Sequence, residues 1–128
     1  MDIVLTACNN NEKYLRLLPY IIRIWKERFN VELKMILVNR EIPEEYKRYE
    51  KNIILYDDYE EGINTAYIAQ IIRIFYPALF EDKNIIITDM DIMPCKRGYI
   101  RNEEVERYDK SKFITYTSRY KKEDKGIL

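Results

Sequence analysis

The sequence predicts an α/β fold with a mostly parallel sheet and helices on both of its faces. Short apolar runs typical of strands alternate along the chain with longer runs of helical period. The first and last of these short runs are almost purely aliphatic, as is typical of strands buried on both faces of a parallel sheet. The length of 128 residues, 47% of them hydrophobic, suits one core. We therefore predict a single domain over residues 1–128.

The first part of the chain predicts a strand, a helix and a second strand. Residues 2–7 contain three contiguous apolar residues and predict the first strand. The asparagines at 9–11 favour a turn and can cap a helix. Apolar residues between 15 and 29 recur at spacings of three and four, which predicts one helical face. Pro19 either kinks this helix or occupies its first turn, and residues 33–38 predict the second strand.

The rest of the chain repeats this alternation. Residues 41–49 have mixed charge and a proline, and they predict a loop or a short exposed helix. Residues 52–56 predict a third strand, and apolar positions from 65 to 80 predict a second long helix. Four apolar or β-branched residues at 85–88 predict a fourth strand, and residues 112–118 are a candidate for one more. Strands that alternate with helices in this way favour parallel pairing.

The composition excludes several classes of function. Because the chain has no histidine, it has no Ser-His-Asp or Cys-His nucleophile pair and no histidine-ligated zinc. Its 22 basic and 22 acidic residues give zero net charge, which argues against a nucleic-acid partner. No apolar run approaches the roughly 20 residues that span a bilayer, and the start does not resemble a signal peptide. We expect a cytoplasmic protein with two reduced cysteines.

The clearest chemical motif is the pair of carboxylates at Asp89 and Asp91, directly after the predicted strand at 85–88. In an extended backbone both side chains lie on the same side, and ligands of open parallel sheets bind beyond the carboxyl ends of strands. Two carboxylates can share Mg²⁺ or Mn²⁺, with waters and substrate phosphates as the other ligands. The alternative is a chance Asp-x-Asp in which Asp89 only caps a turn. We favour the metal site, because like charges beside a buried strand are costly without a counter-ion.

The segments around this motif resemble a known enzyme family. An arginine-bearing helix with a proline at 72–80, an Asp-Lys turn at 82–83 and a strand that leads into Asp-Met-Asp at 89–91 are similar to nucleotide-sugar glycosyltransferases of the GT-A fold, most of all to the glycogenin and lipopolysaccharide-galactosyltransferase type. Residues 1–11 resemble that family's first strand and nucleotide-binding loop. The resemblance covers about residues 1–95 and implies a Rossmann-like donor-binding domain. The chain then represents a fragment, a domain of a larger protein or a pared-down relative.

The resemblance implies metal-dependent transfer of a sugar from a nucleotide-diphosphate sugar, by default a UDP-sugar, to a carbohydrate or glycoconjugate acceptor. Asp91 is implied to bind the Mn²⁺ or Mg²⁺ that bridges the diphosphate, and Asp89 the same metal or the ribose hydroxyls. Met90 is implied to contact the ribose through its backbone. Arg73 is implied to reach the diphosphate or the sugar; the alternative is a pair with a carboxylate near the end of its helix. The base and ribose pocket is implied to be lined by Thr6, Ala7 and Asn10.

The sequence also departs from the family and leaves two other functions open. Cys8 and Asn11 replace an acid and an aromatic residue of the nucleotide loop, and the histidine that often completes the metal site is absent. A haloacid-dehalogenase-type phosphatase also has Asp-x-Asp after an apolar strand; Asp89 would then attack phosphate and Asp91 act as acid and base. That motif normally opens its domain, whereas here it lies late. The other alternative is a non-catalytic sugar-nucleotide-binding domain.

Overall fold

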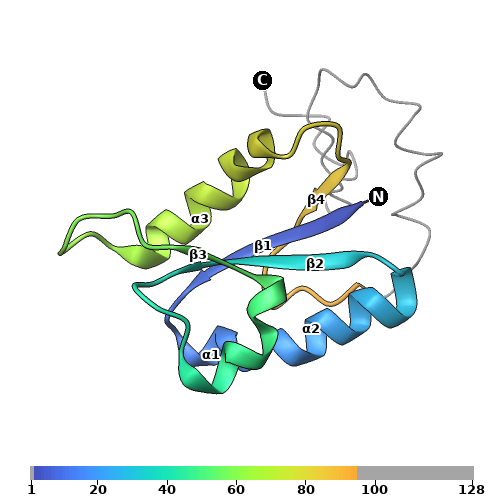
Figure 1. Cartoon of the computed structure of the whole chain (residues 1–128), viewed down its shortest axis with the longest axis horizontal. Coiled ribbons are helices and arrows are strands. Elements are labelled where there is room, and N and C mark those ends of the chain that lie inside the picture. Colours follow the sequence, from blue (N-terminus) through green and yellow to red (C-terminus); the bar gives the residue numbers. More distant parts are fainter. Residues whose placement is uncertain (1, 95–128) are drawn as a thin grey trace, which may run out of the picture. The chain divides into compact units, whose positions relative to one another are not determined.

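Four parallel strands form the sheet of this protein (Figure 1). The structure is a computed structural model that describes residues 2–94, which belong to one compact unit covering residues 1–97. Among the described residues, no helix is long and apolar enough to cross a membrane. The candidate strand at 112–118 and the end of the expected metal loop at 89–95 lie outside the described residues. The single domain over the whole chain therefore stays a prediction.

The sheet has the spatial strand order β3-β2-β1-β4, and every neighbouring pair is parallel. The strands are β1 (Ile3–Asn9), β2 (Glu32–Val38), β3 (Ile53–Tyr56) and β4 (Ile85–Ile87). The predicted α/β class with a parallel sheet is thus confirmed. The central strand β1 is buried from Ile3 to Cys8, and only its last residue, Asn9, is partly exposed. Such burial is typical of a strand that is covered on both faces, as its aliphatic run predicts.

Helices pack against the sheet on both faces, and Figure 1 shows the first two opposite the third. One face carries α1 (Glu12–Leu15), α2 (Leu18–Ile24) and the π-helical turn η1 (Trp25–Phe29). The other face carries α3 (Thr65–Phe75), which continues into the 3-10 turn η3 (Tyr76–Leu79). A second 3-10 segment, η2 (Glu44–Asn52), occupies the region predicted as a loop or short helix and ends where β3 begins.

The first predicted helical face exists, but the helix that carries it is interrupted. Leu15, Leu18 and Trp25 are buried on this face, as the spacing predicts. The spacing also predicts Ile22, but the structure buries Ile21 instead and leaves Ile22 partly exposed. The chain leaves the helix after Leu15 and enters a new one in which Pro19 occupies the first turn. Proline lacks a backbone N–H and is well tolerated there, since the first turn has no intrahelical acceptor for that group. Of the two roles predicted for Pro19, the first-turn position is confirmed.

The second long helix ends earlier than the predicted residue 80. It starts at the N-cap Asn64, whose side chain accepts hydrogen bonds from the backbone N–H groups of Ala66 and Tyr67. It ends at Phe75 and tightens into a 3-10 turn because Pro77 cannot donate to a carbonyl one turn earlier. Its inner side packs on the core of the sheet through Ala69, against Leu5, Ala7, Ile36 and Val38.

Candidate functional site

The strand order places a crevice at the carboxyl end of β1. The connection from β1 to β2 runs through α1 and α2 on one face, whereas the connection from β3 to β4 runs through α3 on the other. Strand β4 therefore pairs with β1 on the side opposite β2, and the strand order reverses at β1. In open parallel sheets the two connections diverge at such a point, and ligands bind in the space between them.

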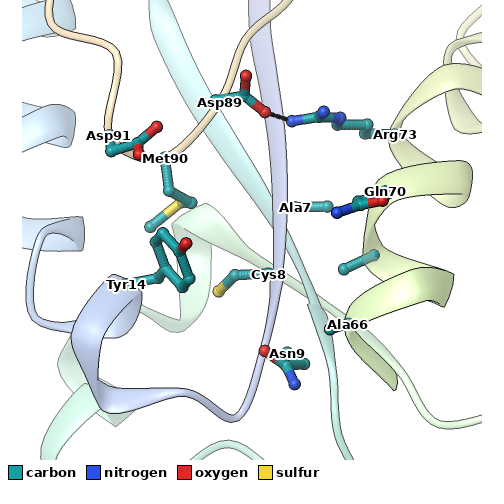
Figure 2. A pocket seen from close by; sticks show the side chains of 11 residues that line it. Ala7, Cys8, Asn9, Tyr14, Ala66, Gln70, Arg73, Asp89, Met90 and Asp91 are labelled. Carbon is teal, nitrogen blue, oxygen red and sulfur yellow. Dashed lines mark ion pairs between the residues drawn. The ribbon is translucent and has the colours of Figure 1, made fainter. Parts of the chain in front are cut away.

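A pocket of about 310 Å³ lies at this reversal (Figure 2). It is lined by residues 7–9 at the end of β1, by Tyr14 of α1, by one side of α3 and by residues 89–91, which follow β4. The backbone N–H of Thr88 donates to the carbonyl of Leu5 at 3.0 Å, which continues the β1–β4 pairing by one residue. The Asp-x-Asp motif consequently leaves the sheet directly beside the end of β1.

Five of the seven residues that the sequence predicts for the site line this pocket. Thr6 does not: it is fully buried one residue earlier on β1, and within the described part of the chain its hydroxyl has no hydrogen-bond partner. Asn10 is exposed and does not line the pocket, whereas its neighbour Asn9 does. The five predicted residues that the structure brings together are Ala7, Arg73, Asp89, Met90 and Asp91.

An ion pair crosses the pocket between Arg73 of α3 and Asp89 of the motif. It joins Nη1 of Arg73 to Oδ1 of Asp89, with 22% and 47% of the two side chains exposed (Figure 2). Burial lowers the pKa of the Arg73 guanidinium, and the nearby Asp91 carboxylate opposes this by favouring the charged form. The partner of Arg73 is therefore a carboxylate of the motif itself, and not one near the end of its own helix.

The residues of α3 that line the pocket lie on one side of this helix. Four residues of α3 line the pocket at positions i, i+3, i+4 and i+7, which share one side of a helix: Ala66, Ala69, Gln70 and Arg73. The two alanines leave room beside β1, and the two longer side chains supply polar groups. The start of the helix is also tied to β1, because Nδ2 of Asn9 donates to Oγ1 of Thr65 at 3.2 Å. Sequence reasoning missed Gln70, although its spacing from Arg73 is a usable signal.

The other wall of the pocket is formed by Cys8, Tyr14 and Met90, which lie on the side of β1 away from α3 (Figure 2). The Cys8 thiol is buried and lies 3.5 Å from the sulfur of Met35, and burial raises its pKa to about 12. It is therefore a neutral thiol at physiological pH. Met90 is also buried, with 3% of its surface exposed, and so it anchors the motif between its two carboxylates.

The donor set of this pocket fits a hard divalent cation. Asp89 and Asp91 present carboxylates to the same space. Among the described residues, no group of three or more His, Cys, Asp or Glu side chains is arranged to hold a metal ion. Mg²⁺ and Mn²⁺ are commonly held by one or two carboxylates with waters and phosphate oxygens. Among the residues that the structure describes, zinc fits poorly, because it takes three or four protein ligands.

Comparison with known proteins gives no match: no protein-family model, no curated protein and no solved structure is similar to this chain. The function is therefore argued from the chemistry of the pocket, since a shared fold class alone does not determine activity.

Proposed function

We propose that the protein binds a nucleotide-diphosphate sugar together with Mn²⁺ or Mg²⁺ and transfers the sugar to a carbohydrate or glycoconjugate acceptor. One observation carries this proposal: Arg73, Asp89 and Asp91 line a single pocket at the carboxyl edge of a parallel sheet. A guanidinium beside two carboxylates supplies groups for both partners of a metal–diphosphate complex. The carboxylates hold the cation, and the arginine binds phosphate oxygens.

The charge pattern suits the departure of a diphosphate. When a sugar leaves a nucleotide-diphosphate sugar, negative charge grows on the diphosphate oxygens. A divalent cation in this site would neutralise that charge as a Lewis acid. Arg73 would add a charge-assisted hydrogen bond from the α3 side of the pocket, and its partial burial strengthens such a contact because little water competes.

The remaining pocket surface suits the nucleoside. The end of β1 offers the small side chain of Ala7 and the amide of Asn9, and the aromatic ring of Tyr14 forms part of the opposite wall. A planar base stacks well on an aromatic ring, and ribose hydroxyls hydrogen-bond with amides and carboxylates. Because the sequence resembles glycosyltransferases that use UDP-sugars by default, we expect UDP to be the nucleotide. Comparing the affinities for UDP and GDP tests this choice.

A calorimetric titration of the full chain with UDP and with GDP, each with and without Mn²⁺, tests the proposal. We expect binding of a nucleoside diphosphate that requires the cation and is abolished by Asp91→Asn. The matched control is Asp58→Asn, which removes the same charge from an exposed carboxylate outside the pocket. Binding that is independent of the cation, or no binding, would refute the donor site.

Product analysis separates this function from the two alternatives. Transfer of the sugar to an acceptor, or slow hydrolysis of a UDP-sugar, supports the glycosyltransferase. Release of inorganic phosphate with a covalent aspartyl-phosphate at Asp89 would support the phosphatase, and cation-dependent binding without either reaction would support a non-catalytic binding domain. The ion pair argues against the phosphatase, because Arg73 already engages the carboxylate that would have to attack phosphorus.

A further inference from the structure

We propose that Arg73 couples the two ligands of this pocket: it occupies Asp89 until a diphosphate takes its place, so that the cation binds weakly alone and tightly with the nucleotide. This inference rests on the proposed function, which it deepens by assigning an order to the two binding events. It rests on the ion pair that joins α3 to the motif across the pocket.

The ion pair engages one of the two described carboxylates that would hold the cation. Of the residues that the structure describes, only Asp89 and Asp91 bring carboxylates to the pocket lining. Oδ1 of Asp89 is engaged by Nη1 of Arg73, so a cation that arrives alone must displace or share this oxygen. It must also lie near the positive charge of the guanidinium, which repels it. Both effects weaken cation binding as long as the guanidinium stays in place.

A diphosphate removes both obstacles. Its oxygens are stronger partners for a guanidinium than one carboxylate oxygen, because they offer two acceptors in the fork geometry of arginine. Once Arg73 binds the diphosphate, Asp89 is released toward the cation, and the diphosphate adds its own oxygens as ligands. Because Arg73 lies on a helix and Asp89 on a loop after a strand, the exchange needs only side-chain rotation and not a rearrangement of the sheet.

The coupling is measured by titrating the full chain with Mn²⁺ and detecting the free ion by its EPR signal, with and without saturating UDP. We expect the Arg73→Gln variant to bind Mn²⁺ alone about tenfold more tightly than the wild type, which corresponds to about 1.4 kcal/mol. UDP should then enhance Mn²⁺ binding less in the variant than in the wild type. A ligand at one site typically changes the affinity of a second site by about 5- to 150-fold. Arg73→Lys, which keeps the charge, should leave the affinity for Mn²⁺ alone close to that of the wild type.

The matched control is Arg23→Gln, which removes an arginine from an exposed ion pair with Glu27 on α2, outside the pocket. It should leave the affinity for Mn²⁺ unchanged. Equal tightening in this control would overturn the inference, because it would reflect net charge alone. An unchanged or weaker affinity for Mn²⁺ in Arg73→Gln would also overturn it.

A second variant tests the same exchange from the anion side. Asp89→Asn removes the partner of Arg73, so inorganic pyrophosphate without metal should bind this variant several-fold more tightly than it binds the wild type. Unchanged or weaker binding would contradict the exchange. The failures of the two proposals are distinguishable: cation-dependent UDP binding with no change in Arg73→Gln refutes only the coupling. Tighter Mn²⁺ binding in Arg73→Gln without any nucleotide binding in the wild type refutes the proposed function and the coupling with it, and leaves only the hindrance of the cation by Arg73.

Discussion

The guanidinium of Arg73 on α3 pairs with the carboxylate of Asp89, which follows β4, beside the carboxyl end of β1. The pair exists because α3 runs over one face of the sheet and the chain then returns next to β1 as β4. Two segments with opposite charge are thereby brought to the edge where the strand order reverses. Ligands of open parallel sheets bind at this edge, so both charges lie where a ligand would be held.

Filling the pocket from the helix side should block ligand binding without unfolding the protein. Ala66 lines the pocket but is otherwise exposed, so a leucine there adds bulk where the nucleotide would lie. We expect Ala66→Leu to weaken UDP binding in the presence of Mn²⁺ by about tenfold or more, within the roughly 1–3 kcal/mol cost of steric conflict in a packed site. Ala78→Leu, on the exposed turn after α3, should leave binding unchanged. Equal binding by wild type and Ala66→Leu in calorimetry would contradict the pocket's role.

The two neighbouring asparagines at the end of β1 should differ in their effect on UDP binding. Asn9 lines the pocket and donates to Thr65, whereas Asn10 is exposed and lies outside it. We expect Asn9→Ala to weaken UDP binding several-fold, since it removes one polar group, worth about 1 kcal/mol. Asn10→Ala should have no measurable effect in the same titration. The reverse order of effects would show that the nucleotide lies beyond the strand end, as the sequence alone suggests.

Removal of the N-cap of α3 should destabilise the fold. The side chain of Asn64 accepts from the backbone N–H groups of Ala66 and Tyr67 in the first turn, where N–H groups have no carbonyl one full turn earlier. The N–H of Tyr67 also donates to the carbonyl of Asn64. We expect Asn64→Ala to lower the free energy of unfolding by about 1 kcal/mol, visible as a lower urea midpoint with an unchanged slope. Asn64→Asp keeps the acceptor and should retain most of the stability. A midpoint that is equally low in both variants would rule out capping as the cause.

The buried Cys8 thiol should make the fold sensitive to alkali. Its pKa rises from 9.0 to about 12 on burial, so between these values the unfolded chain has lost the proton that the folded chain keeps. The free energy of unfolding therefore falls as pH rises through this window, by up to about 1.4 kcal/mol per pH unit.

The alkaline effect is measured by urea unfolding between pH 8.5 and about 11 in a Cys95→Ser background. Cys8→Ala should flatten the decline of stability with pH. Part of the decline should remain, because burial and a hydrogen bond to Glu12 raise the pKa of Tyr46 to about 12 as well. A decline that is the same with and without the Cys8 thiol would show that this group does not titrate as its burial implies.

The sequence was sufficient to predict the sheet and the position of the motif, because both depend on local patterns. Aliphatic runs predict strands, and residues directly after a strand must lie at its carboxyl end. The alternation with helices then fixes parallel pairing, and Asp89 and Asp91 fall at the correct edge. No knowledge of distant contacts is needed for these inferences.

The end of β1 shows where local patterns fail. The sequence predicts that the first strand stops at residue 7, because the asparagines at 9–11 favour a turn and asparagine is a poor strand former. In the structure β1 continues to Asn9, since Cys8 and Asn9 pair with Leu37 and Val38 of the adjacent strand. This longer strand brings Asn9 rather than Asn10 into the pocket. Strand pairing, which a single segment does not reveal, decides the outcome.

Tertiary packing also decides the outcome on α3. Helical spacing between residues 65 and 80 does not decide whether Phe75 or Tyr76 faces the core. The structure packs Tyr76 against the core and leaves 70% of Phe75 exposed. The choice depends on the rotation of the helix over the sheet, which Ala69 sets by its close contact with β1 and β2. The same rotation directs Arg73 to Asp89, a partner that helical spacing alone does not predict.

Paramagnetic broadening by Mn²⁺ in the presence of UDP tests the central claim most directly, because it locates the cation on the full chain. We predict that the methyl signals of Ala7, Ala69 and Met90 broaden and that those of Leu33 on the far part of β2 do not. The same titration with Mg²⁺ gives the diamagnetic reference, and Asp91→Asn should abolish the broadening. Broadening centred on the acidic loop at 57–61, or none at the pocket, would contradict a cation–diphosphate site at Asp89 and Asp91.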